Sequence, residues 1–275
     1  SLSWVYLAVR QDDLELDFRF SEQFYTRAVH QAPNNPVLME RLIMAHMSLG
    51  QFAAASPVAQ RLVAQQVDSQ LVNMMQIATS AEQGQYDSIL QRIDQGKGIG
   101  ALIDRLLVAW AITGQGRMSD ALKAFDAVAK KQGVEAFARY HKALALAHAG
   151  DFESAAEIFE QTVEAGIRLT RRGVIAQIQV LSQLDLDDQA IAVLDLNFDA
   201  SVDPEISNLR QRLSAGETLD FSIVRTPREG LAEVFYSIAN ILSADAEADY
   251  TLFYTRIAQY MRTDHLDADR KSDVS

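Results

Sequence analysis

The five histidines are the side chains of this sequence best suited to acid–base or metal chemistry: His30, His46, His141, His148 and His265. On one helix, the seven-residue spacing of His141 and His148 places them roughly 10 Å apart along the axis. A metal ion is held at about 2 Å from each imidazole nitrogen. This pair therefore cannot share one ion, and we interpret the histidines as ordinary surface or groove side chains.

Carboxylates gather in three short clusters, Asp12-Asp13, Asp185–Asp188 and Asp245–Glu247. A calcium loop needs oxygen ligands at alternate positions over about 12 residues, and none of the clusters has that spacing. Carboxylates are favourable at turns and in the first turn of a helix, where the helix dipole stabilises them. We therefore interpret these clusters as solvated turns or helix starts.

No catalytic motif is found. The segment Lys97–Gly100 is only weakly similar to a phosphate-binding loop, and it fits better as a junction between helical units. The Gly-x-Ser-x-Gly and His-Glu-x-x-His patterns are absent. The chain has no Cys, which excludes disulfides, thiolate metal sites and a thiol nucleophile. The sequence thus predicts a protein that is not an enzyme and holds no cofactor and no metal.

Charge and hydropathy narrow the classes of partner. The formal net charge is −12, whereas nucleic-acid binding requires clustered Lys and Arg, so no nucleic-acid partner is expected. No apolar run approaches the roughly 18 residues of a membrane span, and a soluble chain is predicted. The periplasm and the cytoplasm both stay open, because a signal peptide could have preceded Ser1.

A repeat of about 34 residues organises the elements. Gly50, Gly84, Gly116 and Gly150 each precede a large apolar residue by two positions, and Asp185 continues the phase without a glycine. Apolar stretches of helical periodicity flank each of these positions. Glycine suits a turn that ends a helix, because it adopts positive φ without strain. Each unit is therefore predicted to be a helix, a tight turn and a second helix.

Small residues recur early in the second helix of the units, with a bulky residue four positions later. A small side chain allows two helices to approach closely, and the bulky one fills the space beyond their crossing. The small positions are Ser21, Ala55, Ala121, Ala155 and Ala190, and the bulky ones are Tyr25, Phe125, Phe159 and Leu194.

These features resemble the tetratricopeptide repeat (TPR) family, of bacterial type, over residues 4–197 as six units. The resemblance implies an all-α, right-handed superhelix, a solenoid of about six to seven helical hairpins. Residues 1–200 would form the array. Residues 201–275 would add helices that continue or cap it, including a pair near 228–242 and 246–261, and the whole chain would be the N-terminal part of a longer protein.

The resemblance also implies where a partner would bind. In this family the first helix of each unit lines the concave face, and by phase that face includes Met44, Met47, Met74, Trp110, Phe137, Tyr140 and Arg172. Methionine and aromatic side chains suit a peptide or an amphipathic helix. Packing between units, or cover by the later helices, explains the same pattern equally well. Only Arg172 has the phase of a basic groove residue, so a carboxylate clamp is not expected.

The sequence therefore predicts a non-catalytic scaffold or adaptor that binds a protein or peptide. One alternative is a self-associating array, in which terminal repeats stack end to end or the helix near Tyr250–Tyr260 forms a homodimer interface. The other is the non-catalytic part of a larger enzyme or assembly factor. The sequence does not identify the partner.

Overall fold

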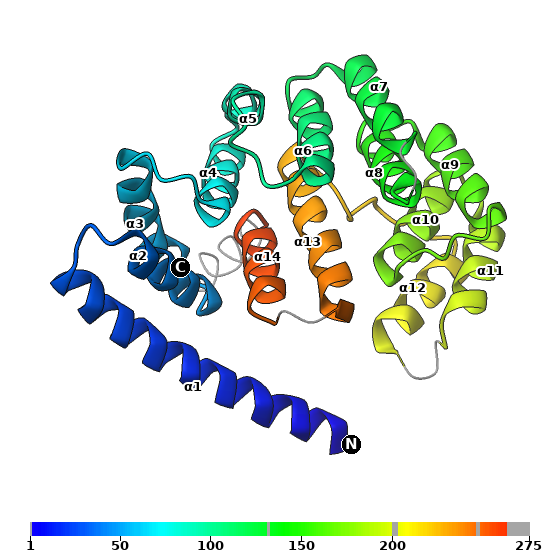
Figure 1. The fold of residues 1–275 in the computed structure, drawn as a ribbon. Coiled ribbons are helices and arrows are strands. Elements are labelled where there is room, and N and C mark those ends of the chain that lie inside the picture. Colours follow the sequence, from blue (N-terminus) through cyan, green and yellow to red (C-terminus); the bar gives the residue numbers. More distant parts are fainter. Residues whose placement is uncertain (1, 131–132, 200–202, 246–247, 263–275) are drawn as a thin grey trace, which may run out of the picture. The chain divides into compact units, whose positions relative to one another are not determined.

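The computed structural model describes residues 2–130, 133–199, 203–245 and 248–262 (Figure 1). Every regular element in these ranges is a helix, which confirms the predicted all-α helical-repeat fold. Successive helices pair in an antiparallel way, as Figure 1 shows for α6 with α7 and α8 with α9.

Within the described ranges, five helical hairpins carry the repeat. We call the first helix of each hairpin its A helix and the second its B helix. The hairpins are α2 (Pro36–Ser48) with α3 (Phe52–Ala64), α4 (Gln70–Glu82) with α5 (Tyr86–Asp94), α6 (Ala101–Gly114) with α7 (Met118–Ala129), α8 (Glu135–His148) with α9 (Phe152–Glu164), and α10 (Arg171–Gln183) with α11 (Asp187–Asn197).

The first predicted unit is not a hairpin. It is one continuous helix, α1 (Leu2–Gln31), which packs against α2. The turn expected at Asp12-Asp13 was wrong, because these residues lie inside α1. The physical reason is that residues 2–31 contain no Gly and no Pro, the two residues that most often end a helix.

The turns between A and B helices are alike in detail. At the first, the N–H of Gly50 donates to the Met47 carbonyl at 2.9 Å, and that of Gln51 donates to the His46 carbonyl at 2.8 Å. This pair of bonds satisfies carbonyls that the helix end would leave unpaired. The φ angles of Gly50, Gly84, Gly116, Gly150 and Asp185 are all positive, which confirms the predicted phase, including the copy without glycine.

A second series of turns, which the sequence analysis missed, closes the B helices. Gln66, Gly96, Gly133 and Gly166 also have positive φ. Gly166 and Ile167 donate to Val163 and Thr162 in the same two-bond pattern. The first four B helices therefore have a left-handed residue in the turn before them and another in the turn after them. Gln66 shows that the second of these positions does not require glycine.

The predicted crossing positions in α3, α7, α9 and α11 are buried, whereas Ser21 and Tyr25 of α1 are partly exposed. Ala55, Ala121, Ala155 and Ala190 are fully buried, and so are Phe125, Phe159 and Leu194 in the following turn. Four of the five B helices therefore meet their neighbours at an alanine, and in α7, α9 and α11 a bulky side chain fills the space beyond. In α5 the corresponding buried residue is Ile89.

The described chain forms two compact units. One contains α1–α5, α13 (Pro227–Asp245) from Ala232 onwards, and α14 (Ala248–Tyr260). The other contains α6–α11, α12 (Pro204–Ser214) packed against α11, and the chain up to Leu231 in the first turns of α13. We call residues 217–226, which join α12 to α13, the connector.

In the first unit, α14 returns to the start of the repeat. It packs against α2 and α4. The Tyr260 ring stacks on Phe52 with centroids 3.5 Å apart, and Arg256 donates to the Ser48 carbonyl at the end of α2 at 3.3 Å. The apolar face predicted for this helix is confirmed in its described part: Phe253, Tyr254, Ile257 and Ala258 are buried.

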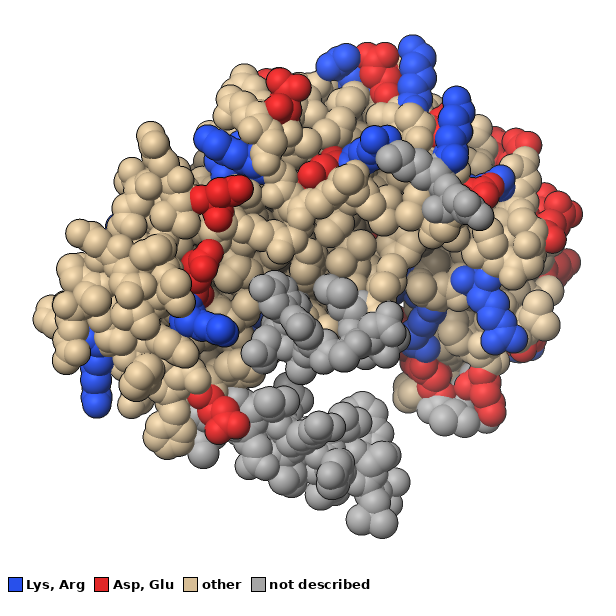
Figure 2. Space-filling model, viewed as in Figure 1, with Lys and Arg blue, Asp and Glu red and all other residues tan. Residues whose placement is uncertain are grey.

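Among the described helices, none is both long and apolar enough to cross a membrane. On the face drawn in Figure 2, Lys and Arg side chains are interspersed with Asp and Glu.

Candidate functional site: the A helices and the connector

The connector runs as an extended segment beside α10, and polar side chains of α10 hold its backbone (Figure 1). The Leu219 N–H donates to Ser182 Oγ at 2.9 Å, and Gln183 Nε2 donates to the Leu219 carbonyl at 2.7 Å. Both main-chain groups of Leu219 are thus paired with α10. A peptide bound in this way is recognised by its backbone as well as by its side chains.

Ser222 is held in a second, reciprocal pair. Its N–H donates to Gln179 Oε1, and Gln179 Nε2 donates to its hydroxyl oxygen, both at 2.9 Å. Arg172, seven residues before Gln179 on the same face of α10, donates to the Ile223 carbonyl at 3.5 Å. Gln179 and Ser182 are buried, so these bonds are shielded from water and would be costly to leave unmade.

Aliphatic side chains of the connector are the second part of the contact. Leu219 is 1% exposed, Ile223 6% and Val224 0%. The Phe221 ring lies edge-on to Phe152 at the start of α9, with centroids 6.5 Å apart. The connector is therefore anchored by three buried aliphatic residues and one aromatic residue, spaced along an extended backbone.

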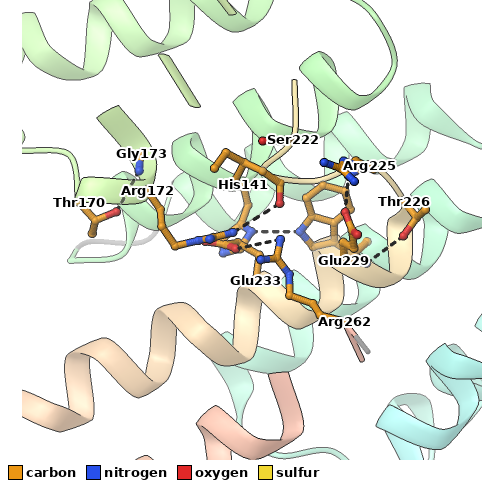
Figure 3. Close-up of polar contacts among 12 residues, drawn as sticks. His141, Thr170, Arg172, Gly173, Ser222, Arg225, Thr226, Glu229, Glu233 and Arg262 are labelled. Atoms are coloured by element: carbon orange, nitrogen blue, oxygen red, sulfur yellow. Dashed lines mark hydrogen bonds and ion pairs between the residues drawn. The ribbon is translucent and has the colours of Figure 1, made fainter. Parts of the chain in front are cut away.

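The connector ends in a well-formed helix start (Figure 3). The N–H of Glu229 donates to Thr226 Oγ1 at 3.2 Å, and the Glu229 carboxylate accepts from the N–H of Arg225 at 2.6 Å. This is a variant of the capping box, with Pro227 at the first helical position. The buried carboxylate of Glu229 thus fixes the direction in which the chain leaves the connector.

The first turns of α13 then pack on α6. A Cβ added to Gly230 would overlap the ring of Trp110, so only glycine allows this approach. Trp110 is fully buried, and its indole N–H donates to His141 Nδ1 at 3.1 Å. Because the indole can only donate, Nδ1 of the fully buried His141 is the acceptor, and the ring proton is on Nε2.

His148, at the end of α8, lies against the connector. Its pKa is lowered, chiefly by burial. A hydrogen bond with the backbone of Arg225 and the charge of Glu229 act in the opposite direction. The neutral imidazole is therefore the form that suits this contact.

The residues expected to line a groove have different environments. Met47, Met74 and Trp110 are buried, whereas Met44, Phe137 and Tyr140 are partly exposed. Tyr140 packs beside Gly173 of α10. Arg172 contacts the connector. In this conformation the three buried side chains are not accessible to a partner. A binding role for the three partly exposed side chains stays a prediction. His46 and His141 are also buried, which corrects their interpretation as surface or groove side chains.

Sequence reasoning missed Gln179, Ser182 and Gln183, which make the best-defined contacts. The available signal was their polarity, because they lie among apolar residues in the second half of an A helix. Polar side chains at positions that the repeat buries usually have a specific hydrogen-bonding partner.

A separate cavity of about 600 Å³ lies beside the end of α9. Its lining includes Arg168, Gln177 and the exposed side chains Val163 and Leu196. Gln177 therefore points to a different surface from Gln179, although both belong to α10. This makes Gln177 a matched control position for experiments on the connector contact.

Two-helix repeats with left-handed turns, buried crossing alanines and an extended segment on their A helices define a helical-repeat protein. Residues 113–168, from the end of α6 to the loop after α9, match the family described as Tetratricopeptide repeat. The chain therefore contains tetratricopeptide-type repeats in this part of the array. Repeats of this kind generally mediate protein–protein interaction. A comparison with curated proteins gave no match.

Proposed function

We propose that the protein is a scaffold or adaptor without catalytic activity, which binds an extended segment of another protein on its A helices. The observation that carries this proposal is the contact between α10 and the connector. Four side chains of one A helix, Arg172, Gln179, Ser182 and Gln183, bind the backbone or the hydroxyl group of an extended segment.

The contact favours an extended segment over a helix. The connector uses the N–H groups of Leu219 and Ser222 and the carbonyl of Leu219 to bond with α10. A helix consumes the same groups internally. A partner helix could therefore fill the apolar positions but could not make these bonds.

Site-specific photo-crosslinking tests the proposal. A photo-reactive residue is placed at Gln183, which contacts the connector, or at Gln177 as the control on the opposite surface. Each chain is irradiated in an extract of its source cells, and adducts are identified by mass spectrometry. We expect a protein adduct from position 183 that is absent from position 177. Adducts from neither position, or equal adducts from both, would contradict a binding surface on α10.

A further inference from the structure

The connector contact also indicates which segment this surface prefers and how access to it is controlled. We infer that the connector is a ligand of α10 held in cis, and that a partner binds by displacing it with a segment of the same chemistry. The inference rests on the proposed function, and it names the partner class and the regulation of the same site.

The pattern of the ligand follows from the contacts. The first anchor is Leu219, whose two main-chain groups are bonded to α10. Three positions later, the hydroxyl of Ser222 accepts from Gln179, and Ile223 and Val224 follow as buried aliphatic residues. The Phe221 ring at the third position contacts Phe152. A matching segment is extended, has an aliphatic residue at its first position, an aromatic residue at its third, a hydroxyl-bearing residue at its fourth, and aliphatic residues at its fifth and sixth.

Positions with exposed side chains set no such requirement. Thr218, Asp220 and Arg225 are exposed on the connector, so a partner can carry other residues there. Specificity therefore depends on the buried aliphatic positions, on the aromatic residue that contacts Phe152 and on one hydroxyl group, and it does not depend on a charge.

The covalent link gives the connector an advantage over any partner. A flexible tether provides an effective concentration of about 1 mM. If connector and partner segment both have an intrinsic Kd of about 1 μM, the free partner is bound with an apparent Kd of about 1 mM. Loosening the connector would restore the intrinsic affinity, so events that weaken its anchors would open the site.

The test uses a fluorescein-labelled peptide with the sequence of residues 217–226 and measures its binding by anisotropy. The connector is loosened in the full chain by Leu219→Ala with Ile223→Ala. We expect this opened chain to bind the peptide at least about tenfold more tightly than the parent chain. A peptide carrying the same two substitutions should bind neither chain.

Substitutions in α10 are tested in the opened chain. In the parent chain they would weaken the binding of the connector and of the peptide alike. Adding Gln179→Ala with Ser182→Ala should weaken peptide binding by about tenfold, through the loss of the bonds to Ser222 and Leu219. Gln177→Ala should leave binding unchanged. Equal effects of the two changes would overturn the inference, as would equal affinity of the parent and opened chains.

A measurement on the unmodified chain covers the case in which the opened chain misfolds. Hydrogen exchange of residues 217–226 is followed by mass spectrometry with and without excess unlabelled peptide. We expect faster exchange at Leu219 and Ser222 when the peptide displaces the connector. Unchanged exchange at a saturating concentration would refute displacement. If position 183 still crosslinks to a partner, the proposed function stands and only the cis-ligand inference fails.

Discussion

The periodicity of an A helix fits two interpretations of Trp110, as a partner-binding residue or as a buried core residue. By phase it belongs to the A-helix surface, where aromatic residues commonly bind partners. In the structure the chain itself covers that surface, and the ring is enclosed between Gly230, Phe125 and His141. A buried indole needs an acceptor for its N–H, and His141 supplies it.

Truncating Trp110 should therefore act on folding. We expect Trp110→Ala to lower the free energy of unfolding by about 3–5 kcal/mol, because it leaves a large cavity. Phe24→Ala, at a side chain that is 65% exposed, should change it by no more than about 0.5 kcal/mol. Urea unfolding followed by circular dichroism measures both. Similar small losses for the two variants would show that Trp110 is solvent-exposed.

At the scale of the helices, the left-handed turns explain how the repeat tolerates a missing glycine. Asp185 occupies the turn between α10 and α11 with a φ of 59°, and it makes the same backbone bonds as the glycines. Aspartate is one of the few residues other than glycine that adopt this conformation readily.

Exchanging residues at these turns should change stability in opposite directions. Gly150 has a φ of 85°, and no atom lies within 4 Å of the place that a Cβ would take, so Gly150→Ala should cost about 1 kcal/mol through backbone strain alone. Asp185→Gly should give a smaller gain, because relief of strain is partly offset by a more flexible unfolded chain. Thermal unfolding measures both.

Gly100→Ala is the control, because Gly100 has open space and no positive φ. It should leave stability unchanged or raise it slightly. If Gly150→Ala and Gly100→Ala behave alike, the conformation assigned to the turn after α8 is wrong.

The hairpins were predictable from the sequence because their determinants are local. A glycine at a left-handed turn and an alanine at a crossing are visible in one unit and repeat in the next. Helix α1 is continuous because it contains no helix breaker. Extending the repeat phase to this segment predicted a turn that its residues do not support. The docking of the connector depends on bonds between residues 43 apart, such as Gln179 and Ser222, and no local pattern encodes them. The sequence analysis placed its candidate residues on A helices, and of the α10 side chains that contact the connector it named only Arg172.

At the scale of the whole molecule, the return of the chain onto its own A helices links stability to pH. His148 lies in this contact, and its pKa is lowered below the ordinary histidine value of 6.5. A base with a lowered pKa binds fewer protons in the folded state than in the unfolded state. The folded state is therefore not penalised by His148 above about pH 6.5. The free energy of unfolding falls as the pH decreases from there towards the pKa of His148 in the folded state.

We expect the urea midpoint of the parent chain to be lower at about pH 5.5 than at about pH 7.5, and His148→Gln to reduce this difference. The carboxylates with lowered pKa values, such as Asp195 and Asp203 beside arginines, act only at more acidic pH and do not interfere. A pH dependence that is identical in parent and variant would exclude a role for His148.

The position of the connector late in the sequence has a consequence for synthesis. The ribosome completes α6, α8 and α10 before it makes Gly230 and the segment that covers Trp110 and Gln179. At about 5–20 residues per second, the nascent chain exposes these side chains for several seconds. During that interval the proposed binding surface has no competitor, because the connector has not yet been made.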